Sequence, residues 1–505
     1  MKMNKTNRIS KTNKTSKTGK ASKTNKINYY QMHHHMKQSG VRTVIEDIFE
    51  SLSKDKSFNL NLIYSSEKGI FRPTGYKVNA IDITQVDYDN YIYKGKQALL
   101  DSANDLKNKI KKNLDLSSPC VLHCHNAGLF KNSCLTAALM MLAKDLENKD
   151  FLLLFQHHDF AEEKRPNRLH LMMNCTGKKD RLFGSRITYP IGKNIHYMSI
   201  NSRDYKLLNL IGIPKSNISI YHNAIDTKIF HAKPMNLDKL KNNIAKYAKQ
   251  NNYFFDLKRK ILLSPLKLIE RKNIAETLLI LKLLNKHKDE WQLLITLEGS
   301  SPDDVRYGDK IKAYIRKNKL PVTIGFGYKL LSPDEKRGRY SNNITDMFAL
   351  SDAVITTSVQ EGFGFCYIEG WVAGKKVIGR RLDYIFRDFE RNNLNMKHFY
   401  KKIMVNKKDF PKHTVEQKIK LLDKADYGTL LNDKELKKTI DVLYSKDSQI
   451  VSHNRKLILK HYSKESYLTR IKSIISKANK VKKQAWKKNP KIDNLSLIRY
   501  FKSLE

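Results

Sequence analysis

Two carboxylates flank a glycine-containing turn in the segment EGFGFCYIEGW. A buried strand ends before this turn and a helix follows it, so Gly362, Phe363 and Gly364 stand at the start of a helix. Free backbone amides and the helix dipole at such a point favour an anion. Glu361 precedes the turn, and Glu369 lies eight residues further along. The segment therefore indicates an anion-binding turn with two carboxylates beside it, although loop geometry alone also explains a Gly-x-Gly turn.

A second loop gathers positive charge. In ILLSPLKLIERKN a strand ends, and Lys267, Arg271 and Lys272 precede a helix whose start is marked by Asn273 and Glu276. Bases beside free backbone amides suit a diphosphate. Ordinary surface charge is the alternative explanation in a chain with 95 Lys and Arg residues.

Histidines gather at two neighbouring strands in the first half of the chain. His123 and His125 alternate on one strand and share a face, and the next strand ends at His157, His158 and Asp159. Imidazole and carboxylate groups are common metal ligands, so a metal-dependent hydrolase is one hypothesis. A His-Asp pair that only caps the following helix is another.

These residues require an alternating α/β chain to position them. From about residue 60, short apolar runs alternate with longer helical patterns, which is typical of parallel β-α-β units covered by helices on both faces. In the first half we predict strands at 120–125, 151–157, 194–200 and 218–221, and helices at 132–146 and 203–210. In the second half we predict strands at 260–264, 293–297, 322–326, 353–357 and 375–379.

The 505 residues suffice for two domains plus appendages. We predict a first Rossmann-like domain over 46–235, a polar linker over 236–258, a second Rossmann-like domain over 259–430 and C-terminal helices over 431–505. Residues 1–45 hold eleven Lys or Arg and no acid, with little apolar content. We predict that they form a disordered, basic, low-complexity tail.

Composition narrows the function classes. The net charge is +45, yet the hydrophobic fraction of 40% allows sizeable cores, and no apolar run is long enough to span a membrane. Five cysteines without a C-x-x-C pair favour a reducing compartment, so we expect a cytoplasmic protein. Basic surfaces attract anionic membranes and nucleic acids. A lysine-rich compositional bias explains them as well, so we expect weak association with anionic surfaces and no specific nucleic acid.

The segment SVQEGFGFCYIEGW, followed by GKKVIG, resembles the E-x7-E signature of retaining family 4 glycosyltransferases, whose GT-B fold has two facing Rossmann-like domains. Further segments resemble the family in the same order: VLHCHNAG, LLLFQHHDF, ISIYHNAIDTKIF, LSPLKLIERKNIAETL and, for the terminal helices that cross back to the first domain, IVSHNRKLILKHYSKESYLTRI. The resemblance covers roughly residues 123–471. GIFRPTGY, with Gly69, Arg72 and Gly75, is the candidate for the family's N-terminal glycine-rich loop.

The resemblance implies a UDP- or GDP-linked nucleotide sugar as donor substrate, with neither a further cofactor nor a metal. Glu369 would bind the ribose hydroxyls, since a carboxylate accepts two hydrogen bonds. Glu361 and the amides of the turn at residues 362–364 would hold the transferred sugar. His158 would contact that sugar from the first domain.

The basic loop would hold the donor diphosphate. Lys267 and Lys272 would neutralise charge on the departing nucleotide, which is electrostatic catalysis. Lys267 replaces the family's usual Arg and loses its bidentate geometry. Glu361, His158 and Lys272 are therefore the expected catalytic residues.

We expect a retaining hexosyltransferase whose acceptor, a carbohydrate, lipid or protein, the sequence does not identify. Two alternatives stay open. One is a nucleotide-sugar epimerase on the same fold, and the other is a basic nucleic-acid or membrane-surface binding protein with a decayed site.

Overall fold

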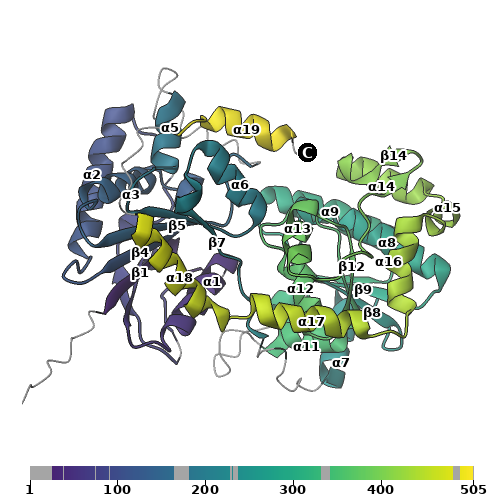
Figure 1. The fold of residues 1–505 in the computed structure, drawn as a ribbon. Coiled ribbons are helices and arrows are strands. Elements are labelled where there is room, and N and C mark those ends of the chain that lie inside the picture. The colour runs from purple at the N-terminus through teal and green to yellow at the C-terminus, as the bar shows by residue number, and fades with distance from the viewer. Residues whose placement is uncertain are drawn as a thin grey trace, which may run out of the picture.

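The computed structural model describes residues 26–37, 39–73, 75–89, 91–163, 181–227, 230, 237–330, 342–481 and 490–503. Two parallel β-sheets, each covered by helices on both faces, lie side by side (Figure 1). The α/β architecture expected from the alternating pattern is confirmed, with the chain passing once from the first sheet to the second and returning at its C-terminus.

The first sheet has seven strands in the order β3-β2-β1-β4-β5-β6-β7. These are β1 Ile27–His35, β2 Phe58–Ser65, β3 Asn79–Asp82, β4 Cys120–His125, β5 Phe151–His157, β6 Ile195–Ser199 and β7 Ile218–Ile220. One face is covered by α2 Lys96–Lys112, α3 Ser133–Asp145, α5 Arg181–Thr188 and α6 Ser202–Ile211, and the other by α1 Gly40–Leu52 and α18 Ser466–Val481. Every residue of β4 and β5 is buried, as two-sided coverage requires.

The second sheet has five strands in the order β10-β9-β8-β11-β12. They are β8 Lys260–Leu268, β9 Trp291–Glu298, β10 Val322–Ile324, β11 Ala353–Thr356 and β12 Lys376–Gly379. One face packs against α8 Ile274–His287, α9 Pro302–Lys317, α14 Val415–Lys424, α15 Tyr427–Leu431 and α16 Lys434–Tyr444. The other packs against α7 Leu237–Gln250, α11 Asn342–Leu350, α12 Phe365–Val372, α13 Asp383–Arg391 and α17 Gln449–Tyr462. Short elements complete the domain: α10 Gly327–Leu330 and the hairpin of β13 Met404–Val405 and β14 Lys408–Asp409.

The disordered tail predicted for residues 1–45 is wrong from Ile27 onward. Residues 27–35 form β1, a central strand paired with β2 on one side and β4 on the other. Its polar side chains are buried because they find internal partners. His34 Nδ1, for example, lies 2.8 Å from the carbonyl oxygen of Val86. Residues 1–25 lie outside the described part of the chain.

The predicted linker at 236–258 contains helix α7, whose Ile244 and Tyr247 are buried in the core of the second domain. Tyr247 also donates a hydrogen bond to the carbonyl of Ile324 in β10, at 3.1 Å. This segment is therefore structurally part of the second domain, and the crossing between domains lies before it. Its lysines occupy the helix surface, which explains its polar appearance in the sequence.

The C-terminal helices cross back to the first domain. Helix α17 packs on α12 of the second domain, and α18 then packs on α1. The Tyr467 hydroxyl accepts a hydrogen bond from the Ala224 amide at 2.6 Å. Helix α19 Asn494–Ser503 lies against α5, where the Asn494 amide group bonds to Glu162 and Ser185. No helix within the described residues is both long and apolar enough to cross a membrane.

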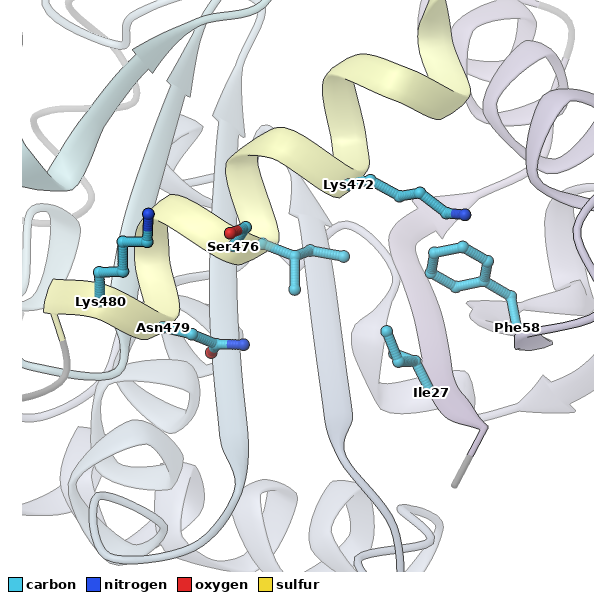
Figure 2. Close-up of a pocket in the computed structure, with 7 residues that line it drawn as sticks. Ile27, Phe58, Lys472, Ser476, Asn479 and Lys480 are labelled. Atoms are coloured by element: carbon cyan, nitrogen blue, oxygen red, sulfur yellow. The ribbon is translucent and has the colours of Figure 1, made fainter. Parts of the chain in front are cut away.

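A pocket of about 590 Å³ lies between α18 and the first residues of β1 and β2 (Figure 2). Ile27, Phe58 and Ile475 form its apolar wall, and Lys472 and Lys480 stand at its rim. Since Ile27 and Phe58 begin their strands, the pocket lies at the amino edge of the first sheet. His158, which was singled out from the sequence, follows β5 at the opposite, carboxyl edge of this sheet.

Candidate functional site

The carboxyl edges of the two sheets face each other across the loops after β5, β6 and β11. In the loop after β11, a Cβ on Gly362 would come within 3.2 Å of the backbone oxygen of His158, which follows β5. The Asn201 side chain, after β6, donates a hydrogen bond to the Gly362 carbonyl at 2.9 Å. Ligands of open parallel sheets bind at such edges.

Lys272 and Glu361 form an ion pair at the carboxyl edge of the second sheet, and only 9% of each side chain is exposed. Arg271 Nη1 lies 3.6 Å from the second carboxylate oxygen of Glu361. Burial alone would raise the pKa of Glu361, but the charges of Lys272 and Arg271 outweigh burial and lower it. Two cations therefore stand beside one ionised carboxylate, which leaves positive charge for an anionic ligand.

Glu369 lies on α12, about one helical turn beyond the loop, and the charges of Lys272 and Glu361 both act on its carboxyl group. Burial raises the pKa of the Glu369 carboxyl to about 7, with Lys272 opposing the rise and Glu361 adding to it. This group therefore gains and loses its proton near neutral pH. In its ionised form it can accept two hydrogen bonds from a diol.

The turn between Glu361 and Gly364 is shaped by its neighbours. Gly364 has φ of +91°, in the left-handed region, and a Cβ there would lie 2.9 Å from the ring of Tyr367. Phe363 is buried in the core of the second domain, so this residue offers only its backbone to a ligand. Among the described residues no side chain caps α12, which leaves its first backbone amides for an anion.

Lys267 stands apart from this cluster. It lies on β8 after a register shift between Ser264 and Lys267, and it is exposed. Among the described residues it forms no ion pair with Glu361. Arg271, which lies next to Lys272 in the sequence, is the second cation that the structure brings to the carboxylate.

His158 turns its ring into the first domain. Its Nε2 lies 3.1 Å from His125 Nδ1, and the rings stack with centroids 5.4 Å apart. His125 Nε2 in turn lies 2.8 Å from Gln31 Oε1. Burial lowers the pKa of His158 to about 4, although Asp159 opposes this shift. The imidazole is therefore neutral at pH 7, and the backbone of His158 is what meets the Gly362 loop.

The other histidines take part in the same internal network. His123 Nδ1 bonds to the Tyr29 hydroxyl at 2.7 Å, and His33 Nδ1 lies 3.4 Å from the His125 carbonyl. Within the described ranges no group of three or more His, Cys, Asp or Glu is arranged to hold a metal ion. The candidate glycine loop follows β2, and Gly69 packs near the backbone of Met36, just beyond β1.

Three contacts between the domains were not predicted from the sequence. Besides Asn201, the Asp388 carboxylate accepts a hydrogen bond from the Ser202 amide at 2.6 Å, and Arg203 lies 4.4 Å over the ring of Tyr384. In the structure Asn201 is also the N-cap of α6, where its side chain accepts a hydrogen bond from the Asp204 amide. Partners 161 to 186 residues apart leave no local pattern in a sequence.

Two facing parallel α/β domains with returning C-terminal helices define the GT-B fold. A glycosyltransferase from Rickettsia africae superposes with a TM-score of 0.52 at 15% identity, covering 90% of this chain and 99% of that chain. Sucrose-phosphate synthase from Thermosynechococcus elongatus superposes with a TM-score of 0.53 at 12% identity, covering 89% of this chain and 98% of that chain. HepE from Anabaena, solved in complex with UDP and glucose, superposes with a TM-score of 0.50 at 12% identity, covering 90% of this chain and 99% of that chain.

The mannosylglucosyl-3-phosphoglycerate synthase of Petrotoga mobilis is 30% identical over 383 residues, which covers 75% of this chain and 69% of the synthase. The chain belongs to the glycosyltransferase family of this synthase. No family model matches the sequence.

Proposed function

We propose that this glycosyltransferase moves a hexose from a UDP- or GDP-linked donor to its acceptor with retention of the anomeric configuration and without a metal. The observation that supports this proposal is the buried ion pair of Lys272 and Glu361, with Arg271 beside it, at the edge that faces His158. The spacing of Glu361 and Glu369 is that of the family 4 signature. A structural neighbour was solved with UDP and glucose, which fits such a donor.

In this proposal Lys272 changes partner during the reaction. A bound diphosphate attracts the Lys272 ammonium and Arg271, and Glu361 is then free to accept hydrogen bonds from sugar hydroxyls. Lys267, exposed on β8, adds charge at the outer side of the diphosphate. As the bond from sugar to phosphate breaks, these cations stabilise the charge that develops on the nucleotide.

Glu369 and the Gly362 turn fix the remaining parts of the donor. The Glu369 carboxylate accepts hydrogen bonds from both ribose hydroxyls, and the amides of the turn bind the sugar. The acceptor oxygen attacks from the face that the diphosphate leaves, and a donor phosphate oxygen takes its proton. No protein nucleophile forms a bond to the sugar. His158 contributes its backbone and shape rather than a proton, because burial keeps its ring neutral.

The acceptor we propose is a sugar that carries phosphate or carboxylate groups. The family relative is a mannosylglucosyl-3-phosphoglycerate synthase, whose product bears both. In this chain Lys68 and Lys131 stand in loops after β2 and β4, at the carboxyl edge of the first sheet. Each now contacts the segment at Asp87 and Tyr88. An anionic acceptor would compete for these cations.

We also place the enzyme in the cytoplasm. Four cysteines in the described residues are free thiols, as expected in a reducing compartment.

The decisive experiment is calorimetric binding of UDP, GDP and ADP, with and without sugars, to the wild type and to the Lys272→Ala and Glu369→Ala variants. We expect one nucleotide to bind, and we expect each substitution to lower the affinity for that nucleotide at least tenfold. Lys310→Ala, which removes an exposed pair with Glu416, is the matched control and leaves binding unchanged. Absence of nucleotide binding by folded wild type contradicts the proposal.

Product analysis tests the rest of the proposal. With 3-phosphoglycerate-bearing sugars as acceptors, proton NMR of the product gives the anomeric configuration, and unchanged turnover in EDTA supports metal independence. An isomerised nucleotide sugar with no acceptor product indicates an epimerase instead.

A further inference from the structure

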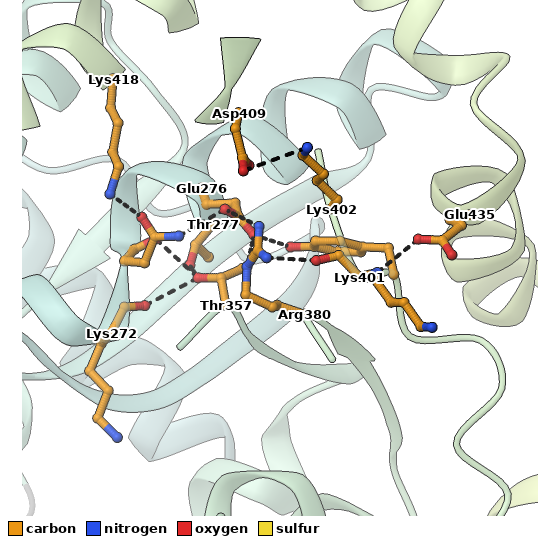
Figure 3. A network of polar contacts seen from close by, with 12 residues as sticks. Lys272, Glu276, Thr277, Thr357, Arg380, Lys401, Lys402, Asp409, Lys418 and Glu435 are labelled. Atoms are coloured by element: carbon orange, nitrogen blue, oxygen red, sulfur yellow. Dashed lines mark hydrogen bonds and ion pairs between the residues drawn. The ribbon is translucent and has the colours of Figure 1, made fainter. Parts of the chain in front are cut away.

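A buried polar network begins at Asn273, the residue that follows Lys272 in the chain (Figure 3). We call it the Glu276 network, and it comprises Asn273, Glu276, Arg380, Tyr400 and Lys418. Glu276 and Asn273 are 0% exposed and Arg380 is 7% exposed. The network joins four parts of the second domain. Asn273 and Glu276 lie at the start of α8, Arg380 follows β12, Tyr400 lies in the loop after α13, and Lys418 is on α14. The mechanism proposed above gives none of them a task.

Glu276 is fully hydrogen-bonded. Its Oε1 accepts from Arg380 Nε at 2.9 Å and from the Tyr400 hydroxyl at 2.7 Å. Its Oε2 accepts from Arg380 Nη2 at 2.8 Å and from the Asn273 side chain at 2.8 Å. A buried carboxylate with a bidentate arginine and two further donors holds a fixed geometry.

Asn273 is held at both ends of its amide group. Its nitrogen donates to Glu276, and its oxygen accepts from Lys418 Nζ at 2.8 Å. The backbone of Asn273 is left-handed, with φ of 52°. A non-glycine residue holds this conformation at an energetic cost, which the side-chain contacts offset. Asn273 therefore fixes the direction in which the chain leaves Lys272.

The peptide of Lys272 is held from the other side by Thr357. The Thr357 hydroxyl lies 3.2 Å from the Lys272 carbonyl and 3.1 Å from the Asn273 carbonyl. Thr277 of α8 meets the same hydroxyl at 2.7 Å. The backbone that carries Lys272 thus has little freedom, and its ammonium reaches Glu361 from a fixed base.

The network also carries surplus positive charge. Arg380 is paired with Glu276, whereas Lys418 has no carboxylate within ion-pair distance among the described residues and meets the charges of Glu276 and Glu270 only from further away. A buried cation without a carboxylate partner is costly. An anion bound at the neighbouring Lys272 reduces that cost.

We infer that Glu276, Arg380 and Lys418 are positioning residues for the donor diphosphate: acting through Asn273, they hold Lys272 where it meets the β-phosphate. This inference rests on the proposed function. It requires that a substitution in the network weakens the binding of nucleoside diphosphates much more than the binding of the matching monophosphates, because only the second phosphate contacts Lys272. A network that serves stability alone would lower the melting temperature and leave that ratio unchanged.

The test compares UMP with UDP and GMP with GDP by calorimetry, in the wild type and in Glu276→Gln, Lys418→Met and Thr357→Val. We expect each variant to lose about tenfold in diphosphate affinity and less than about twofold in monophosphate affinity. Lys282→Met is the matched control, because Lys282 also joins α8 to α14, through the Leu422 carbonyl, without touching Asn273. It should change stability and leave the ratio unaltered.

The outcomes separate the two proposals. If Lys272→Ala removes the preference for diphosphate but Glu276→Gln and Lys418→Met do not, the positioning role is wrong and the donor site stands. If wild type binds no nucleotide, the proposed function fails first. If Glu276→Gln does not fold, Lys418→Met and Thr357→Val test the positioning role instead, because both variants keep the ion pair of Glu276 and Arg380. Equal weakening of mono- and diphosphates by these variants overturns the inference.

Discussion

The hydroxyl of Tyr384 bonds to both backbone polar groups of Glu361. It accepts from the Glu361 amide at 2.8 Å and donates to the Glu361 carbonyl at 2.7 Å. Arg203 of the first domain lies over the same ring. One tyrosine therefore connects the surface of the first domain to the loop that carries the site carboxylate.

Replacing Tyr384 by Phe should loosen that loop while preserving the ring contact with Arg203. Two hydrogen bonds are lost, each worth about 1 kcal/mol, so we expect nucleotide-sugar affinity to fall roughly tenfold. Calorimetry with the cognate donor measures this. Tyr205→Phe, a change on α6 where the ring is partly buried against the core of the first domain, is the control. Unchanged affinity in Tyr384→Phe would show that the loop holds its shape without the hydroxyl.

Removing the charge of Lys272 should leave Glu361 as a buried, poorly compensated carboxylate. We expect Lys272→Met to lose about 3 kcal/mol of stability at pH 7. In the wild type the lowered pKa of Glu361 makes the pair stabilising above the ordinary pKa of a glutamate, and this contribution is lost as pH falls through the lowered value. The variant should therefore differ most from wild type at neutral pH and least near pH 3, as measured by urea unfolding.

Glu369 should show the opposite pH dependence. Its pKa is raised to about 7, so the folded protein favours the protonated form, and the ionised form destabilises the fold as pH rises towards 7 and beyond. We expect Glu369→Gln to be more stable than wild type by about 2 kcal/mol at pH 8.5, with little difference at pH 4. Nucleotide affinity in wild type should rise between pH 6 and 8. A flat difference in unfolding free energy across this range would contradict the raised pKa.

The contact between the domains should govern how closed the enzyme is. Asp388→Ala removes the acceptor for the Ser202 amide, and Asn201→Ala removes the bond to the Gly362 carbonyl. We expect the double variant to show a larger radius of gyration by small-angle scattering and a donor KM raised about tenfold. Asp383→Ala, an exposed change on the same helix α13, provides the comparison. An unchanged radius with unchanged KM would mean that other contacts suffice.

Local signals in the sequence account for much of this structure. The strands expected at 120–125 and 151–157 have those bounds, and the helix expected at 203–210 spans Ser202–Ile211 and ends at Gly212 with φ of +116°. Apolar periodicity carries this information. The assignment of Lys272 and Glu361 to one donor site came from the family resemblance, and in the structure the two side chains form an ion pair.

Other features depend on partners far away in the chain. Strand β1 was missed because His33 to His35 look solvent-exposed, yet they are buried through bonds such as that of His34 with Val86. The ring of His158 turns to His125, and Lys267 is exposed on β8, whereas Arg271 lies beside Glu361. Asn273, beside Lys272, is held by Lys418 of α14, which lies over 140 residues later in the chain. No local pattern encodes such pairings.

The first domain cannot complete its core until helix α18 has been synthesised. Tyr29, Val44 and Tyr221 are buried against Tyr467 and Ile471, so the first domain is built from both ends of the chain. The whole second domain emerges from the ribosome between these parts. Until α18 arrives, the part of this sheet face that α18 covers beside α1 is exposed to water. A chain that stops before residue 466 keeps that apolar surface open to chaperones and to other copies.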